Sequence, residues 1–101
     1  MASIIWTEPA LDQLNDIAEY IALENPGAAQ RLVASVFDKV SRLEHFPQSG
    51  RKPPELPDTD YREILVPPCR IFYRHDESKV LILHVMREER DLRRFMLNAK
   101  S

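Results

Sequence analysis

The chain has 101 residues, 44% of them hydrophobic, and 14 Lys and Arg against 16 Asp and Glu give a formal net charge of -2. This length predicts one domain, residues 1–101, with a core that needs neither disulfides nor a structural metal. The single cysteine excludes an intramolecular disulfide and a thiolate zinc cluster. Because the sequence shows neither a run of 18 apolar residues nor a signal peptide, we expect a cytoplasmic protein without membrane association.

The small net charge hides an asymmetry between the two halves of the chain. Residues 1–50 hold seven acidic and three basic side chains, whereas residues 51–101 hold eleven basic and nine acidic ones. Basic residues gather near the C-terminus, at Arg87, Arg90, Arg93, Arg94 and Lys100. Such a distribution orients a molecule toward an acidic partner on one side only.

The first predicted helix follows a short β-prone run, Ser3–Trp6, which we expect to join a larger sheet. Thr7 is a good N-cap, and Pro9 is tolerated in a first helical turn. Apolar residues then recur at spacings of three and four along the segment. The pattern predicts an amphipathic helix over residues 8–24.

A second amphipathic helix is predicted to begin after Asn25, the N-cap, with Pro26 at its first position. Its apolar stripe continues to Leu43, and Pro47 and Gly50 end it. The connection between the two helices is too short for any arrangement except antiparallel neighbours. The first half of the chain is therefore predicted to be a helical hairpin.

The sequence period changes after a proline-rich loop at residues 47–60. Three strand-like runs follow, at residues 61–66, 69–74 and 79–86, and their short connections predict an antiparallel meander. Residues 91–98 are predicted to form a short terminal helix. The predicted fold class is α+β in the order β-α-α-β-β-β-(α), a helical hairpin packed on a small, mostly antiparallel sheet.

The last predicted strand is apolar on both of its alternating faces. A helical hairpin covers only one face of a sheet, so we expect the terminal helix or a partner protein to cover the other. The aromatic residues that we expect in the core are Trp6, Phe37, Phe46, Phe72 and Tyr73.

Three segments of the sequence carry a resemblance to a known family. They are LEHFPQSGR at residues 43–51, YREILVPPCRIFYRHD at 61–76 and VLILHVMREERDLRRF at 80–95. In this order they resemble the RelE/ParE superfamily of toxins from bacterial type II toxin-antitoxin systems, over nearly the whole chain. RelE-like members are ribosome-dependent mRNA endonucleases, whereas ParE-like members poison DNA gyrase.

The resemblance implies a cognate antitoxin that wraps the toxin with a helix and an extended segment. Such a partner fits the apolar sheet face that the helical hairpin leaves open. The first helix also carries Asp12 and Asp16 four residues apart, either as its solvated face or as a contact for a basic antitoxin or for the arginine-rich end of the chain. The positions expected to bind the antitoxin are Leu11, Leu14, Leu83 and Val85.

Cleavage of RNA without a metal requires charge stabilisation at the phosphorane and a group that transfers protons. Under the RelE-like alternative, Arg62, Arg70 and Arg87 would stabilise the phosphate. His84 is the candidate acid-base residue, although a lone histidine in an apolar strand also fits a structural role. The family's C-terminal acid-base position falls near Arg94–Phe95, where neither side chain transfers protons at neutral pH.

This departure from the RelE pattern favours a ParE-like toxin that inhibits DNA gyrase and is not an enzyme. Its expected target-binding residues are Arg90, Arg93 and Arg94, and we expect neither a metal nor a cofactor. Two alternatives stay open: a metal-independent mRNA endonuclease that acts on the ribosome, and a non-toxic interaction module on the same fold.

Overall fold

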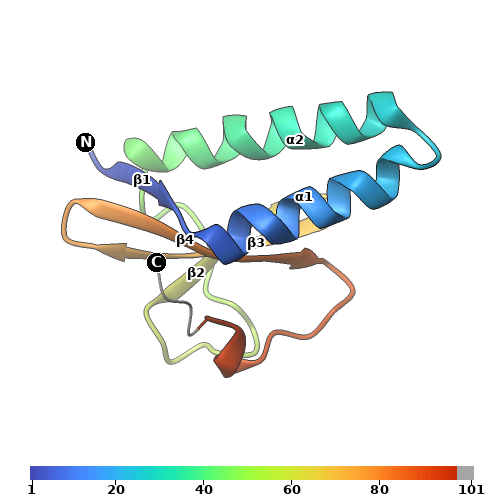
Figure 1. Cartoon of the computed structure of the whole chain (residues 1–101). Helices are drawn as coiled ribbons and strands as arrows, with labels where there is room; N and C mark the ends of the chain where they lie inside the picture. The colour runs from blue at the N-terminus through green and yellow to red at the C-terminus, as the bar shows by residue number, and fades with distance from the viewer. Residues whose placement is uncertain (98–101) are drawn as a thin grey trace.

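The computed structural model describes residues 1–97 as a two-layer α+β fold (Figure 1). In chain order the elements are β1 (Ser3–Trp6), α1 (Glu8–Ala22), α2 (Pro26–Ser41), a 3-10 turn (Arg42–Glu44), β2 (Tyr61–Val66), β3 (Cys69–Asp76), β4 (Lys79–Arg87) and a second 3-10 turn (Arg94–Leu97). Both long helices lie on one side of the sheet, and the C-terminal turn lies on the other (Figure 1). The predicted fold class is therefore confirmed.

The sheet has the strand order β1-β4-β3-β2. Strands β2, β3 and β4 pair antiparallel, whereas β1 pairs parallel with β4, from Ser3 opposite Lys79 to Trp6 opposite Ile82. The predicted meander and the predicted docking of the N-terminal strand are both confirmed. Because β4 continues to Arg87, its last five residues extend beyond β1 and do not pair with it.

Local capping explains where both helices begin. The Thr7 hydroxyl accepts a hydrogen bond from the Ala10 amide at 3.4 Å and donates one to the Ile82 carbonyl at 2.7 Å, which ties α1 to β4. The Asn25 side chain accepts from the Ala28 amide at 3.0 Å. Helix α1 ends at Ala22, two residues before the predicted end. The predicted helical hairpin is confirmed.

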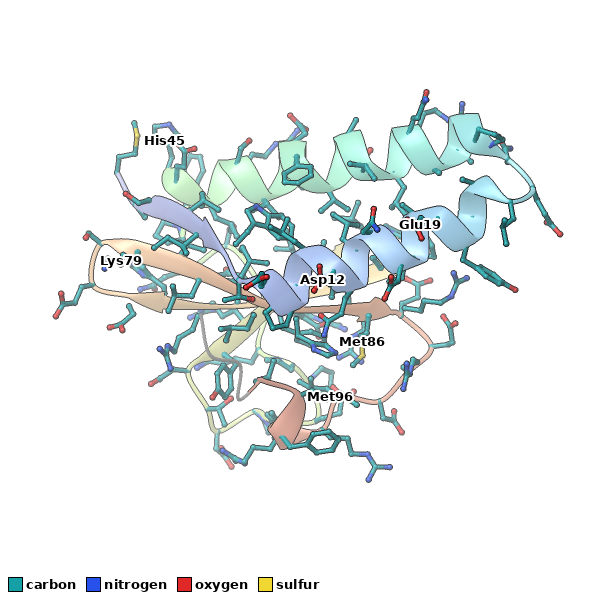
Figure 2. The ribbon with its side chains drawn as sticks, viewed as in Figure 1. Asp12, Glu19, His45, Lys79, Met86 and Met96 are labelled. Atoms are coloured by element: carbon teal, nitrogen blue, oxygen red, sulfur yellow. The ribbon has the colours of Figure 1, made fainter. Side chains whose placement is uncertain are left out.

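Two apolar cores lie on opposite faces of the sheet. The larger one packs α1 and α2 against the sheet, and the smaller one contains Phe72, Leu83, Met86, Leu92 and Leu97. Figure 2 shows Met96 on the C-terminal turn, on the side of the sheet away from the helices. The chain itself therefore covers the second sheet face, through its C-terminal segment and part of the proline-rich loop.

Two sequence predictions need correction. The C-terminal segment forms a single 3-10 turn at residues 94–97 instead of a helix over 91–98, and residue 98 lies outside the described residues. Phe46 is 65% exposed because it follows the end of the helical layer, so it is not a core residue. Phe37 is also partly exposed and packs on Trp6, with ring centroids 4.9 Å apart. Phe72 and Tyr73 are fully buried, as predicted.

Gly50 occupies a position where a side chain does not fit. Its amide donates to the Tyr73 hydroxyl at 2.9 Å, and that hydroxyl donates to the Pro47 carbonyl at 2.8 Å. A Cβ atom at Gly50 would lie 2.6 Å from the Tyr73 hydroxyl oxygen and 2.7 Å from the Glu63 carbonyl oxygen. These two hydrogen bonds hold the start of the proline-rich loop against β3.

We expect Gly50→Ala to lower the free energy of unfolding by about 2 kcal/mol or more, since backbone as well as side-chain atoms must move. Gly27→Ala is the matched control, because its Cβ would meet only the flexible Arg31 guanidinium, at 3.2 Å, and the Asn25 side chain. That change should be neutral or stabilising by up to about 1 kcal/mol. Urea unfolding of both variants checks this, and equal midpoints would contradict it.

Candidate functional site

Arg70 is a buried side chain, 5% exposed, that lies at the centre of an ionic cluster. Its Nε donates to Glu63 Oε1 at 2.7 Å, and its Nη2 donates to Glu63 Oε2 at 3.2 Å and to Glu55 Oε1 at 2.8 Å. Its Nη1 donates to Glu55 Oε2 at 2.8 Å and to the Arg90 carbonyl at 2.9 Å. We call Arg70, Glu55 and Glu63 the Arg70 cluster.

The Arg70 cluster uses all five N–H groups of the guanidinium. The hydrogen bonds from Arg70 lower the pKa of Glu55 from 4.5 to about 2, and those from Glu55 and Glu63 raise the pKa of Arg70 above its ordinary value. Both groups are therefore charged at neutral pH. In this arrangement, Arg70 has no N–H left to donate to a phosphate.

The residues of the RelE-like alternative do not converge on one side of the sheet. Arg62 lies opposite Tyr73, whose side chain belongs to the core under the helices. Arg70 lies opposite Met86, whose side chain belongs to the core on the other face. Because paired residues point to the same face, Arg62 and Arg70 point to opposite faces.

Arg87 and His84, the other two residues of this alternative, also point to opposite faces of the sheet. Arg87 is opposite Cys69 on the helix side, and His84 is opposite Phe72 on the other. Arg62 donates to the Gly50 carbonyl at 2.8 Å, and Arg87 donates to Glu89 at 2.9 Å. The predicted grouping of these residues at one phosphate therefore needs correction.

His84 makes a structural link between β4 and α1. Gln13 Oε1 accepts from the Val85 amide at 2.8 Å, so the Gln13 amide nitrogen is the group 3.0 Å from His84 Nδ1. An amide nitrogen only donates, so Nδ1 is an acceptor and the ring proton of neutral His84 is on Nε2. Burial, with a smaller contribution from Arg90, lowers the pKa of His84 below 6.5.

This lowered pKa predicts a pH dependence of stability. Between the folded pKa and 6.5, the unfolded chain binds more protons than the native one, so stability rises with pH in that window and levels off above it. The free energy of unfolding should therefore fall as the pH is lowered from about 7.5 to about 5. His84→Phe should reduce this dependence. Urea titrations at both pH values check this, and identical pH profiles would contradict it.

The predicted target-binding residues lie in the C-terminal segment. Arg90, Arg93 and Arg94 are all exposed, and Phe95 beside them is 73% exposed. Leu92 and Leu97 are buried in the smaller core and hold the segment against the sheet. The segment therefore presents three cations and an exposed aromatic ring from an anchored stretch of chain.

The predicted antitoxin-binding positions need correction at three of four residues. Leu14 and Val85 are 3% and 2% exposed in the larger core, and Leu83 is 5% exposed in the smaller one. Their side chains are already covered by the chain itself, so a partner cannot reach them in this structure. Leu11 is 40% exposed on α1.

A different apolar surface lies between the two helices. It is an open trough of about 500 Å³, lined by Ala18, Glu19, Ala22, Pro26, Ala29, Gln30, Val33 and Ala34. Helical periodicity places Leu11 on the same face of α1 as Ala18 and Ala22. Asp12 and Glu19 lie along this helix (Figure 2). The trough is thus mostly apolar, and Glu19 is the acidic residue of its lining on α1.

Residues 1–97 contain no candidate for a membrane-spanning helix or a metal site. No helix among them has the length and apolar character needed to cross a membrane. Their His, Cys, Asp and Glu side chains form no group of three or more that could hold a metal ion.

A family model described as the ParE toxin of the type II toxin-antitoxin system parDE matches residues 4–92. The chain belongs to the ParE toxin family. The toxin is 34% identical over 86 residues to Toxin RelE2 of Caulobacter vibrioides, covering 84% of this chain and 93% of that protein. It is 44% identical over 48 residues to the putative toxin Y4kP of Sinorhizobium fredii, covering 48% and 50% of the two chains.

The toxin also shares its fold with a solved structure described as the chromosomal ParDE TA system from P. aeruginosa. The TM-score is 0.72 at 24% sequence identity, over 86% of this chain and 96% of that chain. The two-layer arrangement of the toxin is therefore the arrangement of that structure.

Sequence reasoning missed two features of the toxin. Glu55 is one of three acidic residues in the proline-rich loop, and nothing near it in sequence indicates its pairing with Arg70, fifteen residues later. In the sequence, the small residues of the trough do not stand out from the apolar stripes of the two helices. Their signal was the run of alanines at residues 18, 22, 29 and 34, because small side chains at a helix contact leave a shallow surface.

Proposed function

We propose that this ParE-family toxin inhibits DNA gyrase and does not cleave mRNA. The observation that carries the proposal is the placement of the RelE-type candidates: Arg70 has every N–H engaged, and Arg62 points to the opposite face of the sheet. His84 Nδ1 already accepts a hydrogen bond from the Gln13 side chain. A phosphoryl site needs several groups directed at one transition state, and these candidates are not so arranged.

The proposed gyrase-binding surface is the C-terminal segment with Arg90, Arg93 and Arg94. Arginine and aromatic side chains dominate the energetics of many protein interfaces, and Phe95 stands exposed beside the three arginines. Because Leu92 and Leu97 already hold this segment on the sheet, the segment would lose less conformational entropy on binding.

A paired assay tests the target. Purified toxin at molar excess should block supercoiling by gyrase and should leave a translated mRNA on ribosomes uncut. Unchanged supercoiling without a cleavage complex would overturn the proposal. Codon-positioned mRNA cleavage would establish instead the RelE-like activity, which the name of the Caulobacter relative favours. Normal growth on expression without antitoxin would favour the non-toxic module.

We further propose that the helix of the cognate antitoxin packs in the trough between α1 and α2. Family membership implies this partner, and the small side chains of the trough let a third helix approach closely. The acidic residues of α1, which include Asp12 and Glu19, fit an antitoxin helix with basic residues along one flank. Leu11 extends the apolar surface toward the N-terminus of α1.

Ala34→Arg places a long charged side chain on the trough without disturbing the core, because Ala34 is exposed. We expect it to weaken antitoxin binding at least tenfold, a cost of about 1.4 kcal/mol. Ser35→Arg is the matched control, one residue along α2, exposed and outside the trough. Titration calorimetry with the product of the adjacent reading frame measures both, and equal affinities would contradict the docking site.

A further inference from the structure

We propose that Glu55 is a positioning residue that fastens the C-terminal segment, residues 90–97, so that its arginines face the target. The inference rests on the proposed role of those arginines in target binding. It concerns a residue of a different segment, the proline-rich loop before β2.

Glu55 and Arg70 hold the segment by two polar links on either side of Asp91. Glu55 Oε2 accepts a hydrogen bond from the Leu92 amide at 2.9 Å, and Arg70 Nη1 donates to the Arg90 carbonyl at 2.9 Å. Both links run through the same ion pair, because Arg70 Nη1 also donates to Glu55 Oε2 at 2.8 Å. A change at Glu55 therefore acts on both links at once.

The loop that carries Glu55 is a stiff base for such a fastening. Pro53, Pro54 and Pro57 fix the backbone around it, and the Leu56 amide donates to the Pro53 carbonyl at 3.0 Å. Lys52 Nζ reaches across the loop to the Thr59 carbonyl at 2.6 Å. A carboxylate on a stiff loop fixes the position of what it binds more closely than one on a mobile loop.

The positive charge of the C-terminal segment explains why the segment needs a polar link to the rest of the fold. Arg90, Arg93 and Arg94 lie within five residues of one another and repel, and Asp91 is the only acid among residues 90–97. The carboxylate of Glu55 draws the backbone of this cationic stretch onto the sheet through the Leu92 amide. Buried ion pairs contribute little net stability compared with apolar packing, so fixing one geometry is the function that fits this cluster.

The test compares Glu55→Gln with Asp58→Asn, which makes the same charge change in the same loop at an exposed residue. For Glu55→Gln we expect gyrase inhibition at least tenfold weaker, loss of growth arrest on expression, and at least tenfold faster amide hydrogen exchange at Leu92. Affinity for the antitoxin should be unchanged, which a merely unfolded variant would not show. Asp58→Asn should match the unsubstituted toxin in every assay.

Inhibition by Glu55→Gln equal to that of the unsubstituted toxin would overturn the proposal. So would weaker inhibition with unchanged exchange at Leu92, because Glu55 would then contact the target directly. If Glu55→Gln does not fold, Glu55→Asp, which keeps the charge and is shorter by one methylene, takes its place with the same outcomes. If the unsubstituted toxin leaves gyrase active, the proposed target is wrong, and growth arrest with Leu92 exchange still decides the role of Glu55.

Discussion

Replacing Arg70 by methionine should lower the free energy of unfolding by about 3–5 kcal/mol, the usual cost of removing one partner of a buried ion pair. The change would leave two carboxylates without their main partner, that of Glu63, whose side chain is fully buried, and that of Glu55, whose side chain is 23% exposed. Among residues 1–97, Arg51, at 3.0 Å, would be the one ionic partner that Glu63 keeps. A domain of this size is stable by about 5–15 kcal/mol, so the variant would be close to unfolding at 37 °C.

Arg42→Met is the matched control for this prediction. Arg42 pairs with Asp38 at 3.0 Å, but both side chains are about two-thirds exposed, at 64% and 65%. Exposed pairs of this kind contribute at most about 1 kcal/mol. Urea unfolding at pH 7 measures both variants. A loss below 1 kcal/mol at Arg70, similar to that at Arg42, would show that removing Arg70 does not leave Glu63 and Glu55 as uncompensated buried charges.

This prediction changes how loss of toxicity in an Arg70 variant is interpreted. Under the RelE-like alternative, Arg70→Ala abolishes mRNA cleavage because a phosphate ligand is lost. In this structure the same substitution removes the centre of the Arg70 cluster and both the Arg90 link and the Glu55 pair. Loss of activity therefore identifies a catalytic arginine only when the variant is folded, as binding to the antitoxin would show.

The secondary structure could be predicted from the sequence because its signals are local. Thr7 and Asn25 cap the helices that they precede, and the change of apolar period marks the start of β2 at Tyr61. For the cover of the second sheet face, the sequence allows either the C-terminal segment or a partner protein. Leu92 and Leu97 provide it through contacts that no local pattern reports, and the segment has only one 3-10 turn of regular structure.

The candidate site was less accessible to sequence reasoning, although one part of it follows from the strand register. The two-residue connection between β2 and β3 pairs Val66 with Cys69, and strict alternation then puts Arg62 and Arg70 on opposite faces. This inference requires only the register of the β2–β3 hairpin. The partners of Arg70 do not follow in this way, because Glu55 belongs to a loop whose path is set by its packing and not by any repeating pattern.

Replacing Arg93 and Arg94 together by glutamine should raise the toxin concentration for half-inhibition of gyrase by about 10- to 100-fold, since interface arginines commonly contribute more than 1 kcal/mol each. Both residues are exposed, so the free energy of unfolding should change by no more than about 0.5 kcal/mol. Supercoiling assays over a toxin dilution series measure the first quantity, and urea unfolding measures the second.

The control for this pair is Arg31→Gln with Lys39→Gln, two exposed cations on α2 that make the same change in net charge. General electrostatic attraction to the gyrase–DNA complex would weaken with either pair and would be lost at high salt. Direct contacts would be lost only with the C-terminal pair. If both pairs of substitutions weaken gyrase inhibition equally, Arg93 and Arg94 act only through long-range attraction. If the C-terminal pair of substitutions does not weaken inhibition, this segment is not part of the target-binding surface.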